Sequence, residues 1–145
     1  MQRFVVRKMK FLAIVATALA VPALSEPASA PTLAALNILE SGQWQLRSRT
    51  DPGENRSVCL GDSHTLLQIR HRNATCSRFV IANDPRSATV HYTCPGAGHG
   101  RTTVRVETPR LIQIDSQGIA SNEPFALTLE GRRIGACAGP ASASH

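Results

Sequence analysis

Residues 76–94 read CSRFVIANDPRSATVHYTC, and this stretch decides the fold. Near its middle stands Asp-Pro-Arg at 84–86. Proline fixes φ near the value of the first turn position, and aspartate can accept a hydrogen bond from the backbone ahead of it. We therefore expect a β-hairpin with these three residues as its loop. Folded in this way, the hairpin places Cys94 directly opposite Cys76, and opposed residues suit the geometry of a disulfide.

The same loop sets the register of the two strands. Val90 faces Val80, and Ser87 faces Asn83 next to the turn. Because successive side chains point to opposite faces, a slip of one residue would move every apolar side chain to the other face. The hairpin therefore predicts which residues face the core.

Further strands surround the hairpin. Residues 101–107 (RTTVRVE) and 111–115 (LIQID) alternate between polar and apolar side chains, and a second Pro-Arg turn joins them. A last strand is expected within 124–137, and an early strand within 42–50, where Trp44 points inward. Helices do not alternate with these strands. The pattern predicts a mainly β fold, an antiparallel meander sheet that is open or curled into a half-barrel.

The register predicted for these strands places their even-numbered residues on one face of the sheet. The even-numbered residues on the side of the hairpin cysteines are Val80, Val90, Tyr92, Thr102, Val104, Val106, Ile112 and Ile114. Phe79 and Ile81 point to the opposite side, so we expect an apolar cover there. The one short helix that we predict, at 64–71 with Asp62 or Ser63 as its cap, is the candidate for this cover.

The ends of the chain indicate export. Residues 1–25 combine a basic start with an apolar run too short to span a bilayer, which is the pattern of a signal peptide cleaved within 25–30. We interpret 26–38 as a linker, 39–137 as a single β-rich domain and 138–145 as a disordered tail. The prediction is a periplasmic or secreted protein with no transmembrane segment in the mature chain.

The net charge is modest once the signal is removed. The whole chain has sixteen basic and ten acidic residues and a formal charge of +6. Four of the basic residues lie in the signal, which leaves twelve arginines against the ten acids. This excess is too mild and too evenly spread to indicate a nucleic-acid partner.

The cysteines favour two structural disulfides. Four cysteines follow the signal, and an even count is typical of disulfide pairing in exported chains. With Cys76 and Cys94 paired by the hairpin register, Cys59 is left to pair with Cys137. Two disulfides would stabilise a core that has few aromatic residues.

Two alternatives would use histidines in an enzyme. A metal site would be built from His71, Cys76, His91, Cys94 and His99. Zinc sites usually contain two close ligand pairs, however, and no two cysteines here have that spacing. A hydrolytic site would combine Ser63 and His64 with Asp84 or Asp115, although no nucleophile motif surrounds the serine. We assign no catalytic residue, no metal ligand and no cofactor.

Outward-facing basic residues give the candidate binding surface. The residues that we predict for binding are Arg47, Arg49, His99, Arg101 and Arg105. Four belong to the polar faces of strands, and the histidine belongs to a predicted loop at 95–100. They would suit an anionic envelope component, such as a phosphorylated glycan or a lipid head group. The alternative is an ordinary solvated sheet face, balanced by Glu107 and Glu130.

The order of these motifs resembles a known family. In chain order the motifs are Gly42-x-Trp44, Cys59, Cys76, Tyr92-Thr93-Cys94 and the closing 132–137, RRIGAC. Over about Leu39 to Cys137 the sequence resembles the bacterial exported family catalogued as domain of unknown function 3617. The resemblance implies a small periplasmic or secreted β-rich domain with paired cysteines, and it implies no enzyme activity.

Together these observations predict an exported envelope protein that acts by binding or interaction. Its partner would be an envelope protein or an anionic envelope component. One alternative function is a carrier that holds a small apolar molecule on the inner face of a half-barrel. The other is a metal-binding or hydrolytic enzyme that uses histidines.

Overall fold

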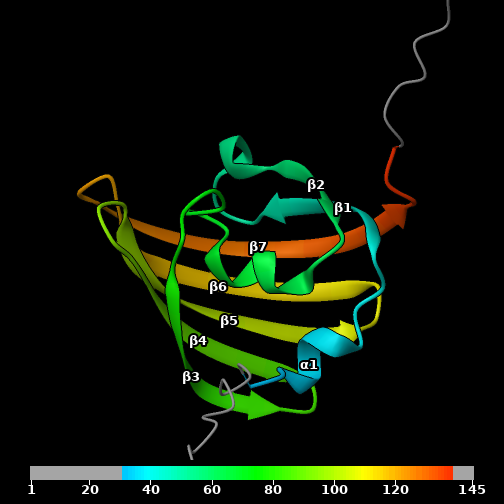
Figure 1. Ribbon diagram of the computed structural model, residues 1–145. Helices are drawn as coiled ribbons and strands as arrows, with labels where there is room; N and C mark the ends of the chain where they lie inside the picture. Colours follow the sequence, from blue (N-terminus) through cyan, green and yellow to red (C-terminus); the bar gives the residue numbers. More distant parts are fainter. Residues whose placement is uncertain (1–30, 139–145) are drawn as a thin grey trace, which may run out of the picture.

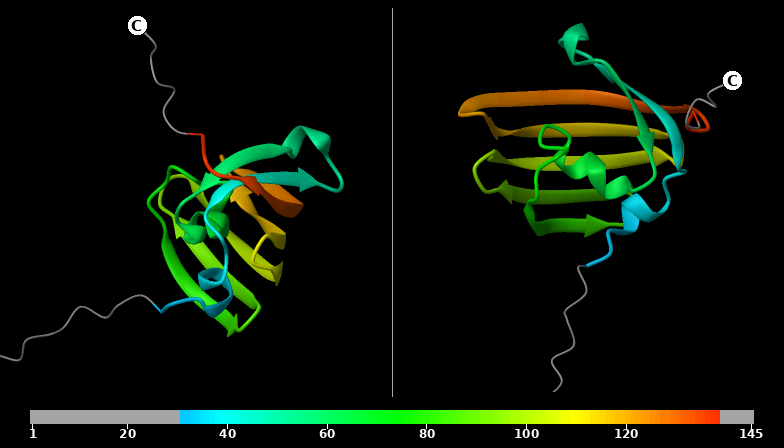
Figure 2. Two further views of the ribbon diagram at one scale, coloured as in Figure 1. Left: turned by 90° about the vertical axis from the view of Figure 1, so that its right-hand side faces the viewer. Right: turned by 45° about the horizontal axis from the view of Figure 1, so that its top comes forward.

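The structure is a computed structural model that describes residues 31–138. Its strands are β1 (Gly42–Ser48), β2 (Arg56–Leu60), β3 (Ser77–Asp84), β4 (Ser87–Cys94), β5 (Gly98–Thr108), β6 (Leu111–Ala120) and β7 (Glu123–Gly135). They form an antiparallel sheet in the order β2-β1-β7-β6-β5-β4-β3, which does not close on itself (Figure 1). The sheet curls around one face into a half-barrel (Figure 2). The predicted mainly β fold is confirmed.

Strands β3 to β7 form the predicted meander, in which each strand pairs with the next. As the alternation predicts, Val104 faces Ile114 and Val106 faces Ile112. β1 pairs with both β2 and β7. The first and last strands of the chain therefore lie side by side, and the edges of the sheet are β2 and β3.

The hairpin has the predicted register at its open end and a different one at its turn. Val80 faces Val90, as expected, but Ser87 faces Asp84 rather than Asn83. The loop is therefore one residue shorter than predicted, and a β-bulge after Val80 absorbs the difference. Two-residue loops are the commonest hairpin connections, because their backbone twist matches that of the strands.

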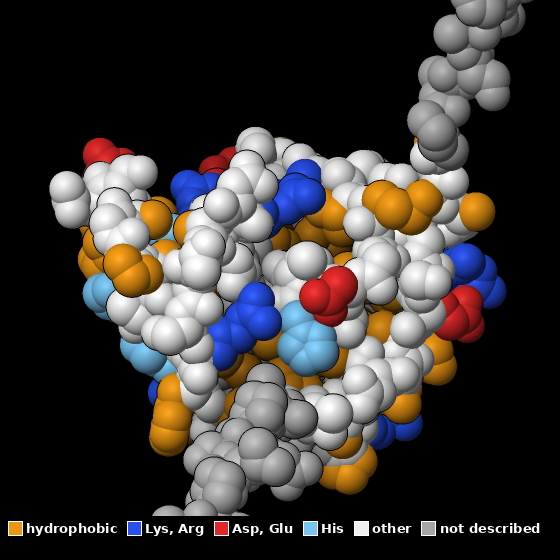
Figure 3. All heavy atoms as spheres, viewed as in Figure 1, with side chains coloured by type: hydrophobic (Ala, Val, Ile, Leu, Met, Phe, Trp, Pro, Cys, Tyr) orange, Lys and Arg blue, Asp and Glu red, His pale blue; other side chains and the backbone are white. Residues whose placement is uncertain are grey.

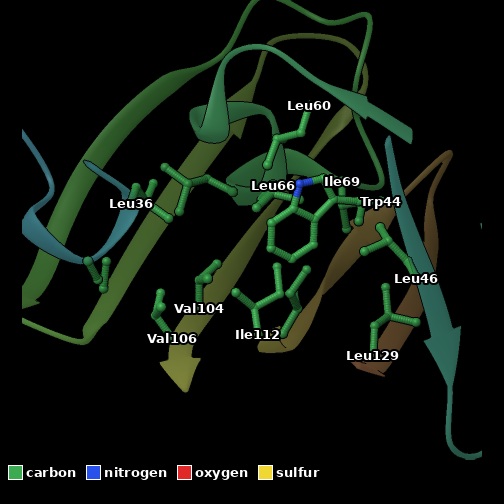
Figure 4. Packing of buried hydrophobic residues seen from close by; sticks show 14 of the residues in the cluster. Leu36, Trp44, Leu46, Leu60, Leu66, Ile69, Val104, Val106, Ile112 and Leu129 are labelled. Carbon is green, nitrogen blue, oxygen red and sulfur yellow. The ribbon is translucent and has the colours of Figure 1, made fainter. Parts of the chain in front are cut away.

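The inner face of the half-barrel carries the core. The even-numbered residues that are at most 1% exposed there are Val90, Tyr92, Thr102, Val104, Val106, Ile112 and Ile114. Trp44 is fully buried, and its indole Nε1 donates a hydrogen bond of 3.0 Å to the carbonyl oxygen of Glu40. Figure 4 shows the indole ring beside Leu66 and Ile112. The parity prediction is confirmed.

Short helical segments cover this face. They are the α-helix α1 (Ala34–Asn37) and the 3₁₀ helix η2 (Ser63–Gln68), while η1 (Pro52–Glu54), a second 3₁₀ helix, lies between β1 and β2. Figure 1 shows α1 and η2 in front of the sheet. Leu36 of α1 and Leu67 of η2 are 1% and 0% exposed. Within residues 31–138, no helix is both long enough and apolar enough to cross a membrane.

The helix predicted at 64–71 lies on the inner face, so its predicted position over Phe79 is wrong. η2 begins after Asp62, whose side chain accepts the backbone N–H of His64 at 2.9 Å, as a cap does. Phe79 and Ile81 on the other side of the sheet are 70% and 44% exposed. A curved sheet encloses volume only on its concave side, and packing there removes more apolar surface from water.

The folded domain extends into the predicted linker, 26–38. Leu33 and Leu36 are 2% and 1% exposed and belong to the core cluster. The domain therefore begins earlier than predicted, because these apolar side chains fill the inner face of the sheet. The predicted signal peptide, 1–25, and all but the first residue of the predicted tail, 138–145, lie outside the described residues.

Both predicted disulfides are present. Cys76 and Cys94 have Cα atoms 4.1 Å apart, and Cys59 and Cys137 have Cα atoms 5.4 Å apart. No cysteine of the described part is free. The second bond ties edge strand β2 to the chain that follows β7. Disulfides are typical of proteins that reside outside the cytoplasm.

Candidate binding site

The predicted arginines lie on the outer face of the sheet but in two separate places. Arg47 lies in β1 and Arg49 follows that strand, whereas Arg101 and Arg105 lie in β5. Strands β7 and β6 stand between β1 and β5. Three strand spacings amount to about 14 Å, so these four side chains do not converge.

Carboxylates compensate part of this charge. Arg49 Nη2 lies 3.5 Å from Glu130 Oε2, and Arg105 Nη2 lies 3.9 Å from Asp115 Oδ2. Glu130 also accepts a hydrogen bond of 2.7 Å from Arg132, and this bond lowers the pKa of the glutamate below its usual range. Exposed ion pairs of this kind contribute little to stability. Their main effect here is to reduce the positive potential of the outer face.

His99 lies in a strand and not in the predicted loop. β5 begins at Gly98, so the β4–β5 connection is shorter than expected. The ring of His99 has its centroid 6.0 Å from that of His91, and both rings line a shallow hollow of about 390 Å³ that also includes Arg101. Of the five predicted binding residues, the structure brings His99 and Arg101 together.

A larger hollow lies at the turn end of the half-barrel. It has a volume of about 680 Å³ and is lined by Arg56 of β2 and by Arg70 and Arg72 from the segment after η2. The β4–β5 and β6–β7 turns contribute Ala97 and Ser121 to its wall. Figure 3 shows that basic side chains (blue) gather on this face of the molecule, above η2 in that view. We name this hollow the arginine bowl.

A single carboxylate opposes the three guanidinium groups of the arginine bowl. Glu54 accepts hydrogen bonds from Arg56 and from Arg70, the latter with Nη1 to Oε1 at 2.8 Å. Arg70 also lies over the ring of Phe125, at 5.9 Å from its centroid. Arg72 forms no ion pair with any residue of 31–138. The arginine bowl therefore keeps an excess of positive charge.

The sequence contains one signal for this site, the run Arg70-His71-Arg72. The helix predicted at 64–71 includes the start of this run, but η2 ends at Gln68. The other walls come from residues far away in sequence, including Arg56 and the β6–β7 turn. Only the curl of the sheet brings these segments to one end of the molecule.

His71 belongs to a buried hydrogen-bonded network rather than to a metal site. The side chain is 7% exposed, with Nδ1 at 3.1 Å from the hydroxyl of Tyr92 and Nε2 at 3.1 Å from the carbonyl oxygen of Ala97. Close by, the hydroxyls of Thr102 and Ser116 lie 2.7 Å apart. Burial raises the pKa of Tyr92 above its usual value. Both ring nitrogens of His71 are thus engaged by the fold.

The structure does not gather the predicted metal ligands, and it places Asp115 of the hydrolytic alternative away from His64. Among residues 31–138, no three His, Cys, Asp or Glu side chains are placed to hold a metal ion. The cysteines of the predicted set are bonded to each other, and His71 lies inside the half-barrel while His91 and His99 lie outside. His64 Nδ1 lies 2.9 Å from Asp62, whereas Asp115 faces Arg105 on the outer face.

Comparison with models of protein families, with curated proteins and with solved structures finds no match to this chain. The resemblance to domain of unknown function 3617 therefore stays a prediction from the order of its motifs.

Proposed function

We propose that this chain is an exported envelope protein, periplasmic or secreted, that binds an anionic envelope component and is not an enzyme. The arginine bowl receives the phosphate or carboxylate of that component. The observation that carries this proposal is that Arg56, Arg70 and Arg72 line one hollow. Glu54 is the carboxylate that neutralises part of their charge, through hydrogen bonds to Arg56 and Arg70.

The chemistry of the arginine bowl suits an anion with several oxygens. A guanidinium group presents N–H donors in a planar fork that matches phosphate and carboxylate. A hollow lined by one sign of charge also raises the local concentration of the opposite ion. The outer-face arginines lack this convergence, because two strands separate them.

Export is supported by two features. Residues 1–25 have the pattern of a signal peptide. The two disulfides suit an oxidising compartment, in which thiols remain paired. A small domain in the envelope meets phosphorylated lipids and glycans at high density, which is where an anion-binding hollow would operate.

The part of the inner face around Trp44 supports a carrier function less well, because the core already fills it. Trp44, Leu46 and Ile112 are fully buried there by the chain's own helical segments. A ligand in their place would have to displace the core, and the loss of one large buried side chain from its packing costs about 3–5 kcal/mol.

The test is binding to vesicles by the full exported protein with both disulfides formed. We expect cosedimentation with phosphatidylglycerol vesicles that weakens as salt rises, and no binding to phosphatidylcholine vesicles. The double variant Arg70→Gln/Arg72→Gln should bind about 20- to 30-fold more weakly, since each arginine near an anionic surface contributes about 1 kcal/mol. Competition by soluble glycerol phosphate distinguishes a free phosphate ligand from a membrane surface.

The matched control is Arg47→Gln/Arg101→Gln, which removes the same charge from the outer face. These two side chains form no ion pair with a described residue, so the change should leave the fold intact. If this pair loses binding while the bowl variant keeps it, the outer face is the site. Binding that is indifferent to salt contradicts the proposal altogether.

A further inference from the structure

A second, smaller cavity lies on the other side of η2, where β3 forms the edge of the sheet. It has a volume of about 240 Å³ and opens between η2, strands β3 and β4, and the chain near Leu33. Figure 3 shows a hydrophobic floor (orange) between a basic side chain (blue) and a histidine (pale blue) near the centre of this face. None of the lining residues belongs to the arginine bowl.

The walls of this cavity are mostly apolar. Leu33, Leu67 and Val90 line it and are at most 2% exposed, because they belong to the core. Val80 of β3 lines the mouth and is half-buried. Small-molecule sites usually measure about 300–1,000 Å³. A cavity below this range suits one unbranched chain and not a ring system or a two-chain lipid.

The guanidinium group of Arg78 lies at the mouth of the cavity, and a hydrogen bond to the buried side chain of Gln68 positions it. Arg78 Nη2 donates a hydrogen bond of 2.8 Å to Oε1 of Gln68. Gln68 is 6% exposed, and its Nε2 donates to the carbonyl oxygens of His71 and Ala74, both at 3.0 Å. These two acceptors determine the orientation of the amide. The guanidinium group therefore has a fixed anchor and keeps other N–H donors for a ligand.

The carboxylate closest to this mouth is already engaged. Asp62 Oδ1 accepts the backbone N–H of His64 at 2.9 Å and lies 2.9 Å from Nδ1 of the same residue. The hydrogen bond from the His64 N–H and, to a smaller extent, the nearby Arg78 lower the pKa of Asp62. The carboxylate is thus hydrogen-bonded to residue 64 and offsets only part of the charge of Arg78. Arg78 remains the charged group that faces a ligand entering the cavity.

We propose that this cavity binds a single medium-length alkyl chain that ends in a carboxylate. The chain lies in the cavity against the wall that Leu67, Val80 and Val90 line, where its burial is driven by the hydrophobic effect. The carboxylate lies at the mouth and accepts hydrogen bonds from Arg78. This site is independent of the arginine bowl and adds a second class of ligand to the protein.

The probe is decanoate, titrated into the full oxidised protein by isothermal titration calorimetry. We expect saturable binding of one decanoate per chain, and weaker binding of decanol, which has the same chain without the charge. Arg78→Gln should weaken decanoate binding about tenfold and leave decanol unchanged, as expected for loss of a charge-assisted hydrogen bond. Arg78 is exposed, so this variant should fold.

The second variant is Val80→Phe, which places a larger side chain in the mouth and should abolish binding of both probes. Thermal unfolding of this variant shows whether the domain is intact. Arg72→Gln is the control, since it changes the arginine bowl and should leave decanoate binding unchanged.

Three outcomes would overturn this inference. They are no saturable binding of decanoate, unchanged affinity in a folded Val80→Phe variant, and loss of decanoate binding in Arg72→Gln. The Arg78→Gln protein should still bind anionic vesicles, because vesicle binding depends on the arginine bowl alone. This measurement therefore distinguishes the failure of one proposal from the failure of the other.

Discussion

Nδ1 of His71 lies 3.1 Å from the hydroxyl oxygen of Tyr92, inside the half-barrel and next to the arginine bowl. The other ring nitrogen lies 3.1 Å from the carbonyl oxygen of Ala97, which can only accept a hydrogen bond. In the neutral ring Nε2 therefore donates, and Nδ1 accepts from the tyrosine. This pair joins the segment after η2 to strand β4.

Tyr92→Phe should destabilise the protein by about 1–3 kcal/mol, because it leaves the buried Nδ1 of His71 without its donor. Urea unfolding measures the change. The control is Phe79→Leu, a substitution at a side chain that is 70% exposed, for which a change within about 0.5 kcal/mol is expected. A Tyr92→Phe protein as stable as the control would show that the hydrogen bond contributes nothing net.

The stability of the protein should fall in alkaline solution through Tyr92. Burial disfavours the phenolate and raises the pKa of Tyr92 above its ordinary value of 10.0, although a hydrogen bond with Ser116 opposes the shift. A raised pKa contributes stability that is fully present below pH 10 and is lost as the pH rises through the folded value. Tyr92 is the single tyrosine of the chain, so phenolate absorbance follows it alone. An equal midpoint in folded and urea-unfolded protein would contradict this expectation.

Glu54→Gln should strengthen binding of anionic vesicles by the arginine bowl. The substitution removes the carboxylate that Arg56 and Arg70 share. A gain of about fivefold is expected, since each charge near an anionic surface contributes about 1 kcal/mol. Cosedimentation measures the effect. Glu130→Gln, which frees arginines on the outer face in the same way, is the control and should change binding little.

The two disulfides should differ in their contribution to stability. The bond from Cys59 to Cys137 spans 78 residues, and that from Cys76 to Cys94 spans 18. Loop entropy in the unfolded chain predicts losses of about 4.5 and about 3 kcal/mol when each pair is replaced by serine. Urea unfolding of the two double variants tests the order. The reverse order would show that the hairpin bond acts mainly through the folded state.

Gly131→Ala should be strongly destabilising, whereas Gly135→Ala in the same strand should be tolerated. A Cβ atom on Gly131 would lie 2.7 Å from Cγ1 of Ile112 and 2.9 Å from Cδ2 of Leu46, inside the packed core. At Gly135 no atom lies within 4 Å of the added carbon. Overpacking costs about 1–3 kcal/mol, and thermal unfolding of both variants measures it. Equal melting temperatures would contradict the packing argument.

Much of the sheet could be predicted because strand periodicity is a local property. The pairing of Val80 with Val90 and the burial of Val104 and Ile114 follow from a tight turn and a period of two residues. The one-residue error at the turn did not change which side chains of the later strands face the core. The bulge after Val80 compensates for it within β3.

The candidate binding sites could be predicted only in part. Arg101 could be predicted because it stands on the polar side of a strand pattern, whereas His99 was predicted in a loop that the structure makes part of β5. Arg56 and Arg72 were missed, since their proximity depends on how an edge strand and the segment after η2 meet at one end of the half-barrel. The spacing of these residues in the sequence does not indicate that the two segments lie close together.

The strands, the hairpin register near the cysteines and both disulfide pairs could be derived from the sequence alone. These features depend on side-chain alternation, turn residues and cysteine count, all of which act over short stretches of chain. The packing of η2 on the inner face and the exposure of Phe79 depend on the three-dimensional shape of the sheet. The same shape brings Arg56 and Arg72 to one hollow. The reason is that sheet curvature selects the concave side for burial and moves distant segments to a common end.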